Sequence, residues 1–136
     1  MKPGGAELKW IDYSSPDTLA EALSLLNEHQ KDAGILAGGT DLIVKMRADR
    51  INPGHIIDIK SIPETTSMEF DTNGALHLGS AVSCADTYAN PKVRSQFTAI
   101  AESCELIGSV QIQNRASAGG NVCNSSPSAD TIPALL

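Results

Sequence analysis

The sequence has no cluster of basic residues, no long apolar run and no Cys-x-x-Cys pair, and each absence excludes a class of protein. Ten lysine and arginine residues stand against sixteen acidic residues, which gives a formal net charge of −6. Binding to a phosphate backbone depends on clustered positive charge, so nucleic acid is not expected as a partner. A membrane span needs about 20 consecutive apolar residues, and a secretory signal needs a basic region before an apolar one, but neither pattern occurs. We therefore predict a cytoplasmic protein with no transmembrane segment.

Residue types that bind metals are also few and scattered. The three cysteine residues are Cys84, Cys104 and Cys123, and the three histidine residues are His29, His55 and His77. Their spacing gives neither a disulfide framework nor a zinc or iron–sulfur site. We expect the cysteines to be buried free thiols, and the histidines to lie at surface or hairpin positions. No metal site and no catalytic side chain is predicted in this chain.

The remaining composition is that of an ordinary globular protein, with 41% apolar and 19% charged residues. These fractions differ from those of a disordered chain, which has few apolar and many charged residues. A length of 136 residues is sufficient for one domain with a real core. We therefore expect one compact domain or two small lobes.

The first part of the chain alternates strand and helix patterns. Residues 10–13 predict a short strand, and Ser15-Pro16 predicts a helix cap followed by proline at the first helical position. Leu19, Leu23 and Leu26 then recur at helical spacing, which predicts a helix face that packs on a sheet.

Two more strands follow this helix. Residues 33–37 predict a buried strand that ends at Gly38-Gly39, residues 41–47 predict a helix, and residues 55–59 predict a third strand. The order strand, helix, strand, helix, strand is typical of a small parallel sheet.

The pattern changes near residue 63. Residues 68–70 and 76–78 alternate apolar and polar side chains around Asn73-Gly74, which predicts an antiparallel hairpin with a two-residue turn. Ser83 is placed to cap a short helix, and Pro91 opens another helical segment. One apolar face of a further helix is expected from Phe97, Ile100, Ala101 and Cys104. We predict that a second lobe, mixed in helix and strand, begins here.

The first glycine pair, Gly38-Gly39, lies between a predicted strand and a predicted helix. Glycine has no Cβ, so its backbone can approach an anion closely, and the N-terminus of the next helix favours negative charge. Thr40 offers a hydroxyl donor in the same segment. The alternative is that the two glycines only make a tight turn. The chain has neither a Walker loop nor a Gly-x-Gly-x-x-Gly motif.

A second glycine-rich segment, residues 117–121, lies in a region that is almost without charge. Its hydroxyl group, glycine amides and side-chain amide suit the many acceptor oxygens of a diphosphate. Two such loops indicate a cleft between them. Only Arg115 and Asp130 are charged between Ile107 and the last residue. Asp130 suits either ribose or ribityl hydroxyls or a helix N-cap, and Arg115 either touches phosphate or, as we favour, pairs with a carboxylate.

Residues 35–43 (ILAGGTDLI) and residues 107–121 (IGSVQIQNRASAGGN) resemble the FAD-binding medium subunit of molybdenum hydroxylases, the family of carbon monoxide dehydrogenase and xanthine dehydrogenase. The resemblance covers nearly the whole chain but only the N-terminal part of the family. It implies an α+β, two-lobed FAD-binding fold of the vanillyl-alcohol oxidase and p-cresol methylhydroxylase type. A small βαβαβ lobe would span residues 1–62. A mixed antiparallel second lobe, incomplete at its C-terminus, would span residues 63–136, so we expect a truncated chain.

The same resemblance implies a function and a set of partners. The chain would be the FAD-binding electron-transfer subunit of a FAD-dependent oxidoreductase, passing electrons from iron–sulfur clusters through FAD to an acceptor. A large subunit would hold the molybdenum cofactor, and a small subunit would hold 2Fe-2S clusters. The contrasting hypothesis is a pair of lobes that binds no FAD and serves as an assembly or interaction module.

Site residues follow from the resemblance by position. Residues 36–42 would line the diphosphate and adenosine side and residues 117–121 would close on it, while Ile107 would pack near adenine and Ser126 and Asp130 would bond the ribityl chain or nearby groups. Residues 79–81 would also lie near the cofactor. The predicted cofactor-binding residues are Leu36, Ala37, Gly38, Gly39, Thr40, Asp41, Leu42, Ile107, Ser117, Ala118, Gly119, Gly120, Asn121, Ser126 and Asp130.

Overall fold

The computed structural model describes residues 10–136, so residues 1–9 of the predicted first lobe lie outside the described part. The first part of the chain contains a three-stranded parallel sheet, as the sequence predicts. Its strands are β1 (Asp12–Ser14), β2 (Ala33–Leu36) and β3 (His55–Asp58). Strand β3 lies in the centre of the order β1-β3-β2, and each of its four residues is buried. A central parallel strand has neighbours on both sides, which is why the HIID segment carries so little exposed surface.

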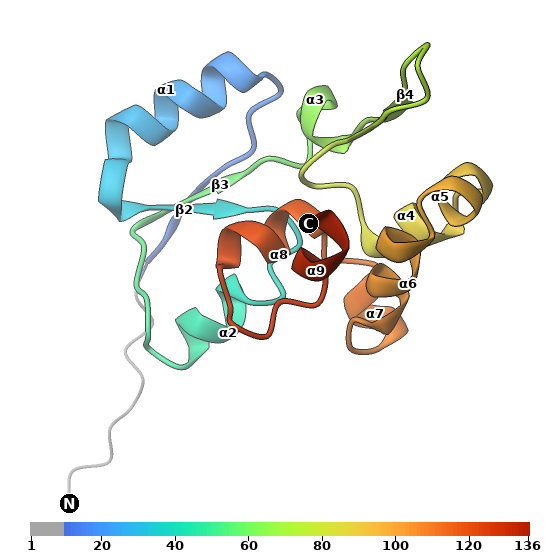
Figure 1. The fold of residues 1–136 in the computed structure, drawn as a ribbon. Helices are drawn as coiled ribbons and strands as arrows, with labels where there is room; N and C mark the ends of the chain where they lie inside the picture. Colours follow the sequence, from blue (N-terminus) through green and yellow to red (C-terminus); the bar gives the residue numbers. More distant parts are fainter. Residues whose placement is uncertain (1–9) are drawn as a thin grey trace, which may run out of the picture.

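Helix α1 (Leu19–His29) covers one face of this sheet (Figure 1). It begins later than expected, because Thr18 rather than Ser15 is the N-cap, and the Thr18 hydroxyl accepts a hydrogen bond from the Glu21 N–H at 3.2 Å. Ala22, with Leu25 and Leu26 beside it, packs on the sheet.

The predicted packing face of α1 is therefore wrong in part. Leu19 and Leu23 are 45% and 56% exposed, and only Leu26 of the three predicted leucines packs on the sheet. Ile35 of β2 was also expected to be buried, but it is 51% exposed. Ile35 pairs in register with Ile57, so both side chains lie on the same face of the sheet. Helix α1 covers only part of this face.

Short elements connect the strands and lead out of the sheet. They are the 3₁₀ helix η1 (Gln30–Asp32), the helix α2 (Leu42–Arg47) and the helix α3 (Pro63–Thr66). Helix α2 starts one residue after Asp41, close to the predicted position. The first glycine pair therefore lies between the end of β2 and the start of α2.

An antiparallel hairpin follows, formed by β4 (Met68–Phe70) and β5 (Leu76–Leu78). Its turn has three residues instead of the predicted two, because the Asp71 N–H bonds the Ala75 carbonyl at 3.0 Å. Gly74 takes a left-handed conformation with φ of 86°. The Asp71 carboxylate also accepts from the N–H groups of Asn73 and Ala75, each at 2.8 Å. These bonds favour the longer turn.

The rest of the chain is helical. Its elements are α4 (Cys84–Ala89), α5 (Pro91–Gln96), α6 (Thr98–Leu106), α7 (Val110–Gln113), α8 (Ala118–Asn124) and α9 (Ile132–Leu135). Ser83 caps α4, as predicted, and Pro91 is the first residue of α5. Ile100, Ala101 and Cys104 form a buried face of α6, which packs with the hairpin in a core separate from that of the sheet. Figure 1 shows α8 returning toward β2 and α2. Helix α9 packs against α6.

Candidate functional site

The first glycine pair is held tightly against the second half of the chain. Gly39 has a left-handed φ of 79°, which L-residues rarely adopt. A Cβ on Gly38 would overlap the main-chain carbonyl group of Arg115, just before the second glycine-rich segment. Glycine is therefore required at both positions, for different reasons.

The second segment is not the loop that the sequence predicts. Residues 118–124 form helix α8, and Ser117 is its N-cap. The Ser117 hydroxyl oxygen accepts a hydrogen bond from the Gly120 N–H at 3.1 Å. Gly119 lies so close to the Ser80 backbone that a Cβ would come within 2.6 Å of it. Close packing thus explains glycines that a helix would otherwise disfavour.

Several main-chain donors in the two segments have no partner of their own. Within residues 10–136, the N–H groups of residues 38–41 and of Ala118 and Gly119 donate no hydrogen bond. For α8 this is the normal state of the first turn of a helix, whose N–H groups lack intrahelical acceptors. Both segments therefore offer free donors to a ligand with acceptor oxygens.

The two segments face one cleft of about 690 Å³. This volume lies within the range of ligand pockets, roughly 300–1,000 Å³. The predicted site residues that line it are Ala37, Gly38, Gly39, Thr40, Asp41, Leu42, Ile107, Ser117, Gly119, Gly120, Asn121, Ser126 and Asp130. Leu36 and Ala118 do not line it, since Leu36 packs beside Gly39 and Ala118 belongs to the helical core. Of residues 79–81, only Ser80 lines the cleft.

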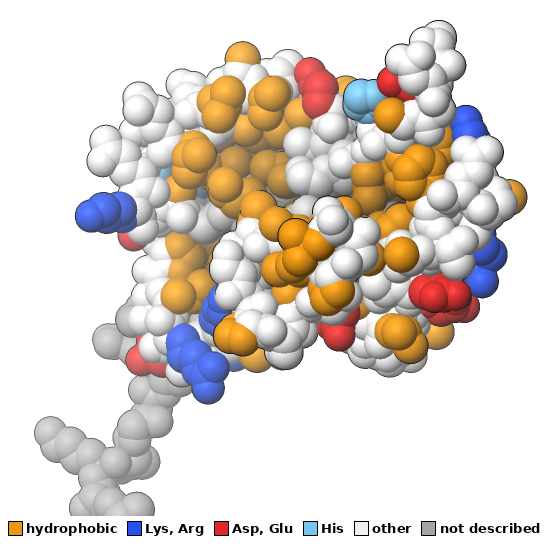
Figure 2. Space-filling view, in the orientation of Figure 1, with side chains coloured by type: hydrophobic (Ala, Val, Ile, Leu, Met, Phe, Trp, Pro, Cys, Tyr) orange, Lys and Arg blue, Asp and Glu red, His pale blue; other side chains and the backbone are white. Residues whose placement is uncertain are grey.

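The cleft also has residues that sequence reasoning missed. Its apolar wall includes Leu26, Ala33, Ile35, Ile59 and Ile112. Figure 2 shows apolar side chains gathered over α1 and β2 on this face of the molecule. No signal in the sequence separates these side chains from core residues, because an exposed wall and a buried core have the same composition.

Polar residues missing from the prediction are Lys45, Cys123, Asn124 and Ser128. Lys45 follows Asp41 by four positions, so helical spacing places both on one face of α2, and this spacing was available in the sequence. Cys123 is exposed, which corrects the expectation of a buried thiol, whereas Cys84 and Cys104 are buried and free as expected.

Asn121 and Asp130 have different surroundings. The side-chain oxygen of Asn121 accepts from the N–H and the hydroxyl of the fully buried Thr131, at 3.1 and 2.7 Å. Asn121 thereby fixes the segment that carries Asp130. The N-cap of α9 is Thr131, without a side-chain cap bond, so the N-cap alternative for Asp130 is wrong. Asp130 is one of the residues that line the cleft.

A charged network lies behind the first glycine pair. The Lys60 ammonium donates to both carboxylate oxygens of Asp58 at 2.7 Å and to the Ala37 carbonyl at 3.1 Å. The Tyr13 hydroxyl donates to Asp58 at 2.6 Å. Burial raises the pKa of Asp58, but the hydrogen bonds from Lys60 and Tyr13 outweigh it and hold this pKa below its usual value. The bond to Asp58 raises the pKa of Tyr13.

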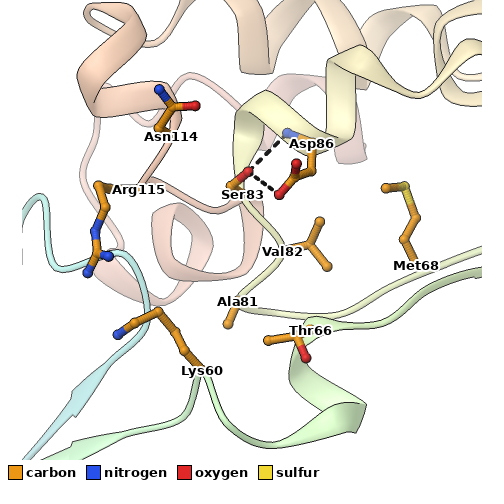
Figure 3. A pocket seen from close by; sticks show the side chains of 9 residues that line it. All are labelled: Lys60, Thr66, Met68, Ala81, Val82, Ser83, Asp86, Asn114 and Arg115. Carbon is orange, nitrogen blue, oxygen red and sulfur yellow. Dashed lines mark hydrogen bonds between the residues drawn. The ribbon is translucent and has the colours of Figure 1, made fainter.

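A second cavity of about 320 Å³ lies beside this network (Figure 3). Its lining includes Lys60 and Arg115, and Ser83 and Asp86 lie on another side. Arg115 forms no salt bridge within residues 10–136, so the favoured pairing with a carboxylate is wrong. Its main-chain carbonyl, rather than its guanidinium group, meets the first glycine pair.

Metal-binding residue types do not cluster in the described part of the chain. Within it no group of three or more His, Cys, Asp and Glu side chains is placed to bind a metal. The rings of His29 and His55 stack at 4.0 Å and His55 is buried, so the expected surface or hairpin position is wrong for His55. No helix in residues 10–136 is long and apolar enough to span a membrane.

Comparisons with known proteins identify the family. Residues 7–136 match the FAD binding domain in molybdopterin dehydrogenase, and the chain belongs to this family. The carbon monoxide dehydrogenase medium chain of Hydrogenophaga pseudoflava is 32% identical over 92% of this chain and 43% of its own length. The caffeine dehydrogenase subunit beta of Pseudomonas sp. strain CBB1 is 33% identical over 93% of this chain and 42% of its own length.

A solved structure gives the same result. The structure of carbon monoxide dehydrogenase from Hydrogenophaga pseudoflava, lacking the Mo-pyranopterin moiety of the molybdenum cofactor, is similar with a TM-score of 0.84 and 31% identity. The match covers 90% of this chain and 42% of that chain. The resemblance to FAD-binding medium subunits is therefore confirmed, and this chain spans less than half the length of these relatives.

Proposed function

We propose that this chain binds FAD in the 690 Å³ cleft, with the diphosphate held between residues 38–41 and the first turn of α8. The observation that carries the proposal is the convergence of free main-chain donors from both segments on one cleft. A diphosphate has many acceptor oxygens and negative charge, which suits such donors and the positive ends of α2 and α8. The residues present thus fit this cofactor.

Other parts of the cleft suit the rest of the molecule. Asp130 is the acceptor for ribityl hydroxyls, and Ser126 also lines the cleft. Ile107 packs near adenine, and the other apolar residues of the cleft exclude water from the ring systems. Leu36 does not line the cleft, and its side chain packs beside Gly39.

We propose two lobes, residues 1–62 and 63–136, in the FAD-binding arrangement of the vanillyl-alcohol oxidase and p-cresol methylhydroxylase type. Two separate core clusters support this division, one between α1 and the sheet and one between the hairpin and helices α4 to α6. The cleft has walls from both sides of the division. A cofactor bound there would bridge the two lobes.

The activity follows from the family. In this proposal the chain is part of a cytoplasmic FAD-dependent oxidoreductase, working beside a large subunit with the molybdenum cofactor and a small subunit with 2Fe-2S clusters. Bound FAD supplies the redox chemistry, taking electrons from the iron–sulfur clusters and passing them to an acceptor. The residues of this chain bind and orient the cofactor and shield it from water.

Equilibrium titration tests this function. FAD is expected to bind saturably to the purified chain, and riboflavin, which lacks both the diphosphate and the adenosine, to bind more weakly. Gly120→Val is expected to weaken FAD binding, because its side chain would press on the Ser117 hydroxyl 2.9 Å away and on the Ala37 methyl 3.8 Å away. Absence of saturable FAD binding would contradict the proposal and favour an assembly module.

A further inference from the structure

The charge of the cleft is unusual for a site that takes a dianion. Among the described residues that line it, Lys45 is the only basic residue, while Asp41 and Asp130 are acidic. Main-chain donors offset part of the cost of bringing a diphosphate there, but they carry only partial charges. Lys45 is the one full positive charge that the lining provides.

Lys45 is also fixed across the cleft. Its ammonium group, on α2, donates a hydrogen bond to the side-chain oxygen of Asn124, the last residue of α8. These two residues are 79 positions apart in the sequence, and both line the cleft. The contact therefore joins α2, which follows the first glycine pair, to α8, which contains the second glycine-rich segment.

The partner of Lys45 is neutral. Asn124 fixes the position of the ammonium group without cancelling its charge, and Lys45 forms no salt bridge with another residue in 10–136. Lys60, by contrast, is paired with Asp58 and does not line the cleft. The positive charge of Lys45 thus remains available to a ligand.

We propose that Lys45 is the charge partner of the cofactor diphosphate, and that Asn124 positions it. The inference rests on the FAD binding proposed above. The charge acts across the cleft over several ångströms, in a partly apolar site where charges are screened less than in water. A neutral residue at position 45 would leave two carboxylates and no cation around the dianion.

Fluorescence titration of FAD at low and high ionic strength tests this role. Lys45→Gln keeps a side chain that can bond Asn124 but removes the charge, and we expect it to raise the Kd on the order of tenfold at low salt. The difference in Kd between Lys45→Gln and the wild type is expected to shrink at high salt, since ions also screen the wild-type lysine. Arg47→Gln is the matched control, because Arg47 lies on the same helix, is exposed and does not line the cleft.

Asn124→Asp provides a second variant, which pairs Lys45 with a carboxylate and is expected to weaken FAD binding in the same salt-dependent way. Circular dichroism establishes that each variant is folded. An unchanged Kd in Lys45→Gln would overturn the role of Lys45 while leaving FAD binding intact. An unchanged Kd in Asn124→Asp would overturn the positioning role of Asn124. An equal loss in Arg47→Gln, or a deficit that persists at high salt, would also overturn it. Absence of FAD binding by the wild type would overturn both proposals.

Discussion

Lys60 donates a hydrogen bond to the main-chain carbonyl of Ala37 at 3.1 Å, directly before the glycine pair that borders the cleft. The same ammonium group is fixed by the buried carboxylate of Asp58 at the end of β3. Lys60 thus ties the end of the central strand to the point where the chain leaves β2. We expect this bond to help orient the free N–H groups of residues 38–41.

We predict that Lys60→Met raises the Kd for FAD roughly tenfold, because a hydrogen bond from a charged group contributes about 1.5–3 kcal/mol and its loss frees the Ala37 carbonyl. Lys60→Arg, which retains the charge and donors, should recover much of the affinity. Isothermal titration calorimetry measures both. Lys31→Met removes an exposed lysine that does not line the cleft and serves as the control. Equal affinities for Lys60→Met and the wild type would contradict this role.

Gly38→Ala is expected to weaken FAD binding and to destabilise the fold, because the added methyl group would overlap the Arg115 carbonyl and force the two segments apart. The expected destabilisation is about 1–3 kcal/mol, as for other overpacked positions. Urea unfolding and FAD titration measure the two effects.

Gly34→Ala is the control for this change. Its methyl group would meet only the side chains of Ile56 and Pro53, at 3.0 Å or more, and side chains can adjust. We expect a smaller loss of stability and little change in the Kd. If Gly38→Ala behaved like Gly34→Ala in both assays, the contact between the segments would not matter for the site.

The network of Asp58 predicts a dependence of stability on pH. The pKa of Asp58 is lower in the folded chain than in the unfolded chain, so the folded state binds fewer protons. Its contribution to stability is therefore present above the unfolded pKa of about 3.9 and is lost as pH falls through the folded pKa. Urea unfolding between pH 3 and pH 7 should show a difference between wild type and Asp58→Asn that narrows at acidic pH. A constant difference over this range would contradict the prediction.

How far the sequence predicts this site depends on the segment. The order strand, Gly-Gly, helix left open whether the glycines bind an anion or only make a tight turn, and residues 36–42 were assigned to a site by the family resemblance; residues 37–42 of this range line the cleft. The helical start at residue 118 was not predicted, since two glycines in succession disfavour a helix. Tertiary packing on Ser80 and the cap of Ser117 override that preference.

The fold, like the site, was predicted only in part from the sequence. Parallel pairing followed from the alternation of elements, but the packing face of α1 did not, because Ala22 makes the close approach while two leucines stay exposed. The stacking of His29 on His55 joins positions far apart in sequence, so no local pattern reveals it. The contact of Lys45 with Asn124 was hidden for the same reason.

Cys123 gives a chemical test of where the cleft lies. It is exposed and lines the cleft, whereas Cys84 and Cys104 are both fully buried. We predict that a maleimide labels Cys123 alone in the native chain and that saturating FAD slows this labelling. Mass spectrometry of the peptides identifies the site, and Cys123→Ser should abolish the signal. Labelling at an unchanged rate with FAD bound would place the cofactor elsewhere.

Amide NMR during an FAD titration is the most direct test of FAD binding between the two glycine-rich segments. We predict that the N–H signals of Gly38, Gly39, Gly119 and Gly120 shift together along one saturable curve. Signals of Glu69 and Thr72 in the hairpin, which do not line the cleft, should remain in place. Shifts confined to other residues, or no saturable shift at these four glycines, would contradict the binding of the FAD diphosphate between the two segments.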